Sequence, residues 1–551
     1  SFRGCLCRRI TALSESDRLL ASCADALSTS QRRPFTFSKS SLIANPTFKM
    51  SIDLSLDRLQ ALFTKLPLLY SRTTVHIAGT NGKGSVSALT DSILRHASPP
   101  LSTGRFNSPH LVHITDCILI NDAPVSFASY LRTKKVVEEL NEREQTGLTP
   151  FEVLTLTALQ LFEEARVDVA VMEVGLGGRL DATNVIPSSN ILVSALTAVD
   201  LDHQRFLGST LAAIAREKAG IAREGKPFVY GPQKLENREA VDRAVKETVG
   251  RIGAEVVNPI EVERVEESEG ASSTVRFASR EGTFTPPAGT SVKFTIPSIS
   301  STPISTSLPL HGAHQLDNLS TSLGIIHALL SHPSSLELSD ARGLNLRSRI
   351  TEEGVRRGVE SVKWRGRLSW HAYSHPRTGE TLPVLVDGAH NPASAQTLRS
   401  YIASLFAHPS STSSKRKIQL TYILALSHSP PKTPREVLEP LLRPSALAPG
   451  FWNSPSLDVE LSVAAVPFTK VTDMPWVKYV EPKKLVDVVR EIHGASDAEG
   501  PVPDIWVPPS DELSLKEGEK NVYLEEALKW AASKGKVSEE GVEGERVKDE
   551  D

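Results

Sequence analysis

Three glycines gathered around one lysine are the first residues in this sequence whose types and spacing could do chemistry. They lie in "VHIAGTNGKGSVSA", residues 75–88, after a β-branched run typical of a strand and before a sequence typical of a helix. Glycines at positions 79, 82 and 84 would let backbone N–H groups converge on an anion, Lys83 would add a positive charge, and a helix starting near Ser85 would add its positive end. This pattern predicts a triphosphate site, although Gly84 separates Lys83 from Ser85, unlike in the standard phosphate-binding loop. The alternative is a glycine-rich turn that binds nothing.

A buried acidic residue follows further along the chain. The run "VDVAVMEV" at 167–174 is typical of a buried strand and ends near Glu173, whose charge needs a partner there; a cation is the natural one. Parallel α/β sheets gather ligand-binding residues at the carboxyl ends of their strands, so we expect Glu173 near the glycine loop. The next residues, "GLGGRLDATN", carry Arg179 and Asp181, which could belong to the site or form a surface salt bridge.

A third group of chemically capable residues comes after the next strand-like run. The segment "AVDLDHQRFLG" places Asp202 and His203 at the same expected sheet edge, and Lys218 follows in "IAREKAGI". A helix lysine ordinarily keeps its ammonium group in water. The alanine and isoleucine neighbours of Lys218 leave open a desolvated lysine with a lowered pKa, which would be able to do chemistry.

The elements that must position these residues alternate between strand-like and helix-like segments. Buried parallel strands are predicted at 72–78, 167–174 and 190–197. Helices are predicted at 85–97, 151–165 and 209–221. This alternation is typical of a doubly wound α/β domain. A further strand-like run at 381–391 predicts a second, smaller α/β domain after a linker near 350–362.

The composition narrows the class of protein. The chain has 551 residues, of which 40% are hydrophobic and 23% charged, which suffices for two globular domains with cores of their own. A formal net charge of −3 provides no basic field, so neither nucleic acid nor a membrane is an expected partner and small-molecule chemistry is favoured. Four cysteines without a disulfide or metal-binding spacing suit a reducing compartment.

Both ends of the chain differ from the part between them. Residues 1–49 are rich in arginine and serine, and we interpret them as an N-terminal extension, either a disordered leader or a mitochondrial transit peptide. The cytoplasm is the expected location, with the mitochondrion as the alternative. Residues 534–551 are polar and charged without an apolar period, which predicts a disordered tail.

Eight motifs, in order between about residues 50 and 485, resemble the folylpolyglutamate synthase and dihydrofolate synthase family within the Mur ligase group. They are "HIAGTNGKGSVSA", "FNSPHL", "MEVGLGGRLDATN", "DHQRFLG", "IAREKAGI", "HGAHQLDN", "WRGRLSW" and "LVDGAHNPASA". The resemblance implies a phosphate-loop, ATP-binding domain of the Mur ligase type at 50–358 and a smaller Rossmann-like C-terminal domain at 359–533. It also implies an active site in the cleft between these domains.

The resemblance further implies roles for individual residues. The ATP-phosphate positions are Thr80, Asn81, Gly82, Lys83, Gly84 and Ser85, and the other ATP contacts are Asn318, Arg367 and Asp387. The magnesium positions are Ser108, Glu173 and His203. Lys218 matches the lysine that is carbamylated in this family and supports a second magnesium, and Lys83, Lys218 and His203 are the implied catalytic residues. Taken singly, Asn318 could instead be a helix cap, Asp387 a turn residue and Arg367 a surface charge.

The implied activity is ATP-dependent amide formation. A carboxylate is a poor electrophile, so transfer of the γ-phosphoryl group first gives an acyl phosphate, which the amine of L-glutamate then attacks. The segments "GRFNSPHLVHITDCILIND" and "FTKVTDMPW" resemble monofunctional dihydrofolate synthases of fungal type, which implies dihydropteroate as the acceptor and a monomeric enzyme. Extension of tetrahydrofolate by a folylpolyglutamate synthase is the alternative. Remoter alternatives are a phosphotransferase with the same loop and an inactive nucleotide-binding protein.

Overall fold

The described part of the chain contains every predicted site residue. A computed structural model describes residues 55–265, 284–376, 381–406, 416–428, 433–443, 457–469, 477–494, 503–509 and 521–534. The predicted extension at 1–49 lies outside these residues, as does the predicted tail except for its first residue, Lys534. Within the described ranges, no helix has the length and apolar character needed to cross a membrane.

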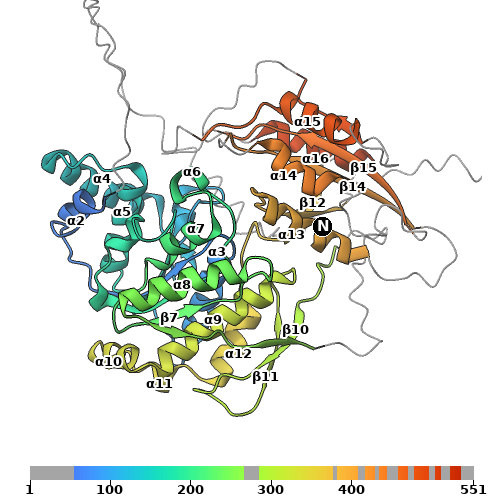
Figure 1. Cartoon of the computed structure of the whole chain (residues 1–551). Coiled ribbons are helices and arrows are strands. Elements are labelled where there is room, and N and C mark those ends of the chain that lie inside the picture. The colour runs from blue at the N-terminus through green and yellow to red at the C-terminus, as the bar shows by residue number, and fades with distance from the viewer. Residues whose placement is uncertain are drawn as a thin grey trace, which may run out of the picture. The chain divides into compact units, whose positions relative to one another are not determined.

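The central element is an eight-stranded sheet with the strand predicted at 72–78 in its middle. In Figure 1 the strands of this sheet are coloured from blue to green along the chain. Its strand order is β4(Ala123–Pro124), β3(Ile118–Ile120), β2(Thr103–Phe106), β5(Val169–Glu173), β1(Thr73–Ala78), β6(Ile191–Leu196), β7(Pro227–Tyr230) and β8(Glu255–Val257). The parallel strands are β2, β5, β1, β6, β7 and β8. Strands β3 and β4 add an antiparallel edge beside β2. The three predicted strands are confirmed as β1, β5 and β6, which lie side by side.

Helices cover both faces of this sheet. The residues of β5 show this, because Val169 and Val171 belong to one buried cluster while Ala170 and Met172 belong to another. The first cluster receives residues from α3(Lys83–Arg95), α9(His314–Ser331) and α12(Glu352–Ser361); the second receives residues from α2(Asp57–Phe63), α4(Phe127–Glu144) and α5(Pro150–Glu164). A third cluster includes residues of α7(Leu211–Ala219) and α8(Arg238–Ile252). The prediction of a doubly wound α/β fold is confirmed.

The local sequence explains where the predicted helices begin. Thr149 and Glu152 form a reciprocal capping box at the start of α5, and Pro150 occupies its first position, where a missing N–H costs nothing. Helix α3 begins at Lys83, two positions before the expected start near Ser85. The lysine of the glycine loop therefore lies on the first turn of the helix.

The prediction of a linker near 350–362 is wrong. Thr351 caps helix α12 by accepting a hydrogen bond from the Gly354 N–H, and Val355 and Val359 join the buried cluster under the sheet. Gly358 lies so close to α3 that a Cβ there would come within 2.6 Å of the Ile93 Cα. Gly358 thus allows close packing of two helices where a linker was predicted.

The chain beyond α12 forms the second α/β part. The antiparallel hairpin β12(Ser369–Ser374)–β13(Thr381–Val386) contains the strand predicted at 381–391. A parallel sheet follows, in the order β14(Arg416–Leu424), β15(Leu457–Ala465) and β16(Asp504–Trp506). Its helices are α13(Pro392–Phe406), α14(Pro434–Leu442), α15(Pro482–Gly494) and α16(Val522–Lys534). Residues of α13, α14 and α15 share a buried cluster with β14 and β15, so this part has its own core.

Smaller elements complete the description. An antiparallel sheet of β11(Ile304–Leu308), β10(Thr290–Phe294) and β9(Val262–Arg264) includes part of the serine- and threonine-rich stretch before α9. Short helices are α6(Gln204–Leu207), α10(Pro333–Ala341) and α11(Leu346–Arg349).

The order of the strands in the central sheet indicates where a ligand would bind. Strand β1 lies between β5 and β6, so the connection from β5 to β6 crosses over β1. Ligands of α/β sheets bind at such a topological switch point.

Candidate active site

The glycine loop connects β1 to α3 and has a backbone that only glycine accommodates easily. Gly79 has a φ of 151° and Gly82 a φ of 94°. A Cβ at Gly79 would lie 1.8 Å from the Thr197 Oγ1, and one at Gly82 would lie 2.1 Å from the Asn318 Oδ1. Because Thr197 and Asn318 pack directly against these glycines, the loop backbone is closely confined where it enters the N-terminus of α3. The predicted ATP residue Asn318 therefore packs against the loop. It lies in the second turn of α9, so it is not a helix cap.

Hydrogen bonds tie this loop to the segment that follows β6. The backbone N–H groups of Thr80 and Asn81 donate to the Ala198 carbonyl, at 2.9 and 3.2 Å. The Thr80 hydroxyl donates to the Asp200 carbonyl at 3.1 Å and accepts from the Asp200 N–H at 3.0 Å. Ser85, in the first turn of α3, is buried. The loop is thus held at the carboxyl end of β6 as well as of β1.

Glu173 ends β5 and is buried beside the loop lysine. Its Oε1 lies 3.7 Å from the Lys83 Nζ, and its Oε2 accepts a 2.8 Å hydrogen bond from the Asn107 side-chain amide. The Lys83 ammonium also donates to the Thr80 carbonyl at 3.3 Å. The positive partner expected for Glu173 is, in this structure, the lysine of the glycine loop.

Asn107 is a site residue that the sequence analysis missed. It follows β2 directly, is buried, and has an Oδ1 that accepts no hydrogen bond from any residue the structure describes. The predicted magnesium residue Ser108 is its neighbour and is half-buried. The position after a strand in the "FNSPHL" motif was the available signal for Asn107. An unpaired amide oxygen beside a carboxylate suits a hard cation.

Asp202 and His203 lie at the carboxyl end of β6, as expected. His203 adopts a φ of 50°, and its N–H donates to the Asp202 Oδ1 at 2.7 Å. The Asp202 carboxylate is buried, whereas the imidazole of His203 is more than one-third exposed, with its Nε2 3.8 Å from the Asp202 Oδ2. A partly exposed imidazole thus lies next to a buried carboxylate.

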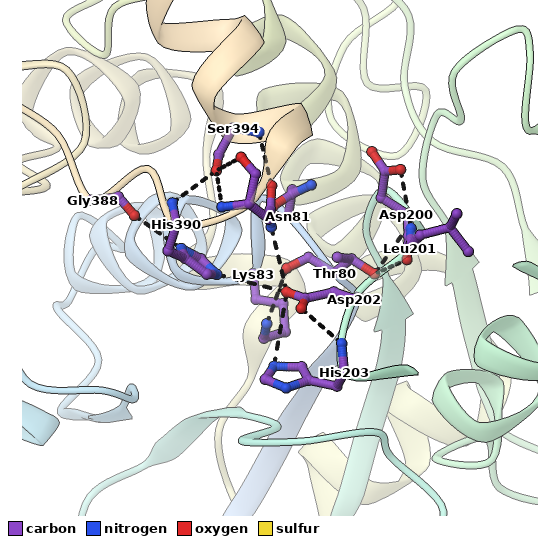
Figure 2. A network of polar contacts seen from close by, with 12 residues as sticks. Thr80, Asn81, Lys83, Asp200, Leu201, Asp202, His203, Gly388, His390 and Ser394 are labelled. Atoms are coloured by element: carbon purple, nitrogen blue, oxygen red, sulfur yellow. Dashed lines mark hydrogen bonds and ion pairs between the residues drawn. The ribbon is translucent and has the colours of Figure 1, made fainter. Parts of the chain in front are cut away.

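The segment "DGAHN" of the second part of the chain reaches this same carboxylate (Figure 2). The His390 Nε2 lies 3.7 Å from the Asp202 Oδ2, and the Asn391 amide donates to that oxygen at 3.4 Å. Asn391 also donates to the Asn81 Oδ1 at 3.4 Å. His390 and Asn391 were missed as individual residues, although the sequence analysis quoted their motif.

Lys218 is buried in the last turn of α7, and its ammonium group donates a 2.8 Å hydrogen bond to the Gly79 carbonyl. Burial and, to a lesser extent, the charge of Lys83 lower the pKa of Lys218 to about 7, although Asp202 and Asp181 act in the opposite direction. The interpretation of Lys218 as a solvent-exposed helix lysine is therefore wrong.

Arg179 and Asp181 have separate, structural surroundings. Arg179 is exposed and pairs with Glu217 at 3.0 Å, as in the surface interpretation, although its partner is not Asp181. Asp181 is buried and accepts hydrogen bonds from the Leu176 N–H and the Thr183 N–H, and its burial raises its pKa. These bonds shape the loop whose Gly178 packs against the backbone of Lys218.

Arg367 and Asp387 flank the β12–β13 hairpin. The Asp387 Oδ2 accepts a 2.9 Å hydrogen bond from the Leu368 N–H, and burial raises the pKa of Asp387. The Arg367 guanidinium donates to the Gly366 carbonyl at 3.0 Å and would lie 2.2 Å from a Cβ at Gly388. Both residues are held by backbone contacts at the base of the hairpin.

No group of three or more His, Cys, Asp or Glu side chains that could hold a metal ion occurs among the residues described. Glu173 and Asn107 nevertheless offer a carboxylate and an amide oxygen, the donors that magnesium accepts. Magnesium keeps several waters and binds substrate phosphates, so few protein ligands suffice. The residues present fit such an ion.

We expect Gly82→Ala to weaken nucleotide binding about tenfold, because its Cβ would lie 2.1 Å from the Asn318 Oδ1 and displace the loop backbone at the start of α3. The left-handed backbone costs an L-residue roughly 1–2 kcal/mol, so the control variant must share that strain. Titration calorimetry with a non-hydrolysable ATP analogue measures the effect. Gly225→Ala is the matched control, because Gly225 has a φ of 65° with no atom within 4 Å of a Cβ. Equal affinity in the two variants would contradict the assignment of the loop.

Fold and site together define a class of protein. A glycine loop at the central strand of a doubly wound sheet, followed by a smaller α/β part, is the architecture of Mur ligase type nucleotide-binding proteins. Residues 77–326 match the Mur ligase middle domain, and residues 369–451 match the C-terminal domain of dihydrofolate synthetase.

Individual proteins narrow this class to a family. The chain is 33% identical over 442 residues to dihydrofolate synthetase of Saccharomyces cerevisiae, covering 80% of this chain and 87% of the yeast protein. It is 31% identical over 436 residues to a probable dihydrofolate synthetase of Schizosaccharomyces pombe, covering 79% and 87%. Among solved structures, Mycobacterium tuberculosis folylpolyglutamate synthase complexed with ADP and AMPPCP matches with a TM-score of 0.61 and 26% identity, over 87% of this chain and 88% of that one. The chain belongs to the dihydrofolate synthase and folylpolyglutamate synthase family, which confirms the resemblance seen in the sequence.

Proposed function

We propose that this protein is an ATP-dependent ligase that joins L-glutamate to dihydropteroate, forming dihydrofolate, ADP and phosphate. The observation that carries a ligase, as opposed to a phosphotransferase, is the contact of two further segments with the glycine loop. Lys218 bonds to the Gly79 carbonyl, and Asn391 bonds to Asn81. A phosphotransferase would share the loop and Glu173 but would need neither of these residues.

The proposed ATP site consists of the loop and the residues that contact it. Backbone N–H groups from Gly82 to Ser85 would hold the phosphates at the start of α3, and Lys83 would neutralise charge on the γ-phosphoryl group. Thr80 and Asn81 would line the site next to them. Asn318 packs on the loop and would contact the nucleotide. Arg367 and Asp387 would reach it from the hairpin of the second part. The binding of ADP and AMPPCP by the mycobacterial protein supports this assignment.

Magnesium would bind at Ser108, Glu173 and His203, with Asn107 as an added ligand, and would supply charge neutralisation for phosphoryl transfer. The Lys83 ammonium now lies beside Glu173, so binding of the ion would redirect that ammonium toward the phosphates. A carbamate on Lys218 would support a second magnesium. Carbamate formation needs a free amine, and the pKa of about 7 makes one available.

The proposed reaction has two steps. The dihydropteroate carboxylate attacks the γ-phosphorus, and the bond to the β–γ bridging oxygen breaks, which releases ADP and leaves an acyl phosphate. The glutamate amine then attacks the acyl carbon, loses a proton and expels phosphate. The protein binds, orients and neutralises charge in both steps, so no side-chain nucleophile is needed. A monomeric enzyme in the cytoplasm, or in the mitochondrion if residues 1–49 direct import, completes the proposal.

We expect the purified protein to add one glutamate to dihydropteroate and then stop, because the two fungal relatives at this level of similarity are named dihydrofolate synthetases. Coupled ADP release with dihydropteroate plus glutamate, compared with tetrahydrofolate plus glutamate, measures the preference. Mass spectrometry of the products gives the number of glutamates. Efficient formation of polyglutamates from tetrahydrofolate would instead identify a folylpolyglutamate synthase.

A further inference from the structure

Four charged side chains form a cluster around the helix that follows the glycine loop. We call Asp91, Arg95, Arg105 and Asp122 the α3–β2 cluster, after the two elements that carry its first three members. Asp91 pairs with Arg95 at 3.1 Å and with the Arg105 Nε at 3.5 Å, while Asp122 pairs with Arg95 at 3.3 Å and with Arg105 at 2.7 Å. Two arginines thus balance two carboxylates.

Arg105 is the buried cation of this cluster, and the carboxylates do not use all of its donors. Its side chain is 2% exposed, against 21% for Arg95. Its Nε and Nη1 make no hydrogen bond within the described ranges, although the Nε lies 3.5 Å from the Asp91 carboxylate. Its guanidinium carbon lies 5.0 Å from the centre of the Trp364 ring. A guanidinium at this distance from an aromatic ring is attracted by the ring's charge distribution, most strongly where water is excluded.

Trp364 in turn packs on the glycine loop. A Cβ at Gly84 would come within 2.5 Å of the Trp364 Cζ2, so the ring lies against the first turn of α3. The indole Nε1 is buried and has no hydrogen-bond partner among the described residues, so packing and the Arg105 contact hold the ring. Two residues further, Gly366 lies against Leu111. Trp364 begins the segment that carries Arg367.

We propose that Arg105 is a positioning residue for nucleotide binding that acts through Trp364. By holding the indole ring against Gly84, Arg105 fixes the segment 364–367 beside the phosphate loop and so places Arg367 toward the nucleotide. This inference rests on the proposed ATP site but not on the identity of the acceptor substrate. The face of the guanidinium contacts the ring, while its edge carries the ion pairs with Asp91 and Asp122.

Arginine is required for this double role. A lysine at 105 would preserve the positive charge near Asp91 and Asp122, but it lacks the planar group that stacks on an indole while hydrogen-bonding in its own plane. Arg95 provides a matched control, because it pairs with the same two carboxylates, whereas the guanidinium over the Trp364 ring is that of Arg105. If only the geometry of the charges mattered, Arg105→Lys and Arg95→Lys would change nucleotide affinity equally. If stacking on Trp364 matters, only Arg105→Lys would lower the affinity.

The test measures nucleotide affinity directly. We expect Arg105→Lys to weaken binding of a non-hydrolysable ATP analogue about tenfold in titration calorimetry, the size of a desolvated cation–π contact, and Arg95→Lys to leave it nearly unchanged. The KM for ATP should rise by a similar factor while the KM for glutamate stays constant. Equal weakening by Arg105→Lys and Arg95→Lys would overturn the proposal.

A second pair of variants shows whether the effect passes through the ring. Trp364→Phe keeps an aromatic face and should bind the analogue within a few-fold of the wild type, whereas Trp364→Leu should lose about tenfold. Combining Arg105→Lys with Trp364→Leu should cost no more than Trp364→Leu alone, because both changes remove one contact. Additive losses, or wild-type affinity in Trp364→Leu, would refute the proposal even if Arg105→Lys did not fold. These binding measurements need neither dihydropteroate nor glutamate, so failure of the proposed reaction would be distinguishable.

Discussion

Replacing Lys83 with alanine is expected to reduce glutamate-dependent ATP turnover by about 10³-fold, the usual cost of removing a charge that stabilises a transferring phosphoryl group. Lys83 is the only residue of the loop "GTNGKGS" with a charged side chain. Its Nζ lies 3.7 Å from the Glu173 Oε1, next to the loop where we expect the phosphates to bind. Initial rates of ADP release, with dihydropteroate and glutamate present, measure the loss.

The fold should survive this change. The Lys83 side chain is partly exposed and belongs to none of the buried apolar clusters, and Glu173 would keep its hydrogen bond from Asn107. Because Glu173 loses its nearby ammonium group but keeps that hydrogen bond, thermal unfolding should shift by several degrees while remaining cooperative. Lys293→Ala removes a lysine from a more exposed ion pair, with Glu263 at 2.8 Å, far from the loop in sequence, and should leave turnover unchanged. Near-normal turnover in Lys83→Ala would refute the phosphate assignment.

Replacing Lys218 with alanine is expected to have the second-largest effect, a loss of at least about 10²-fold in turnover, comparable to the loss of a metal-supporting group. The amine is buried and lies 2.8 Å from the Gly79 carbonyl, so a carbamate formed on it would remain close to the phosphate loop. Short carboxylic acids in the buffer should partly restore activity to Lys218→Ala by occupying the place of the carbamate. Lys218→Arg should be equally inactive, but it should not be rescued, because its side chain fills that space.

The carbamate itself can be observed without measuring activity. Carbon-13 NMR of protein equilibrated with labelled bicarbonate should show one carbamate signal that is absent from Lys218→Ala. Because only the neutral amine reacts, and because burial lowers the pKa of Lys218 to about 7, the signal should grow as the pH rises through 7. No signal between pH 7 and 8.5 would rule out carbamylation, and Lys218 would then act as a neutral hydrogen-bond donor to the loop.

The same pKa shift has a consequence for stability in protein without the carbamate. An unfolded lysine stays protonated up to about pH 10.4, whereas native Lys218 loses its proton near pH 7. Between these values the unfolded state binds more protons, so the free energy of unfolding rises with pH, and the cost of burying the charge is greatest below pH 7. Denaturant unfolding of the wild type and Lys218→Met should show this slope only in the wild type.

Local chemistry allowed much of this protein to be predicted from its sequence. Strands β1, β5 and β6 were predictable because apolar, β-branched runs form strands buried on both faces. The glycine loop was predictable because Gly79 and Gly82 occur where a strand turns into a helix. Lys218 could be singled out because a lysine among alanines and isoleucines is unusual, but its neighbours alone left a solvent-exposed helix lysine equally open.

Tertiary structure alone decided which groups meet. Nothing local to Lys218 specifies the Gly79 carbonyl 139 residues away, and nothing local to Asn391 specifies Asn81, 310 residues away. A linker was predicted near 350–362, yet Val355 and Val359 of α12 are buried and Gly358 packs against α3. Residue types and periods thus determined the strands, the loop and the candidate chemistry, since these depend on neighbours along the chain. The partners of Glu173, Asp202 and Arg105 depend on how distant elements pack together, and only the folded structure contains that information.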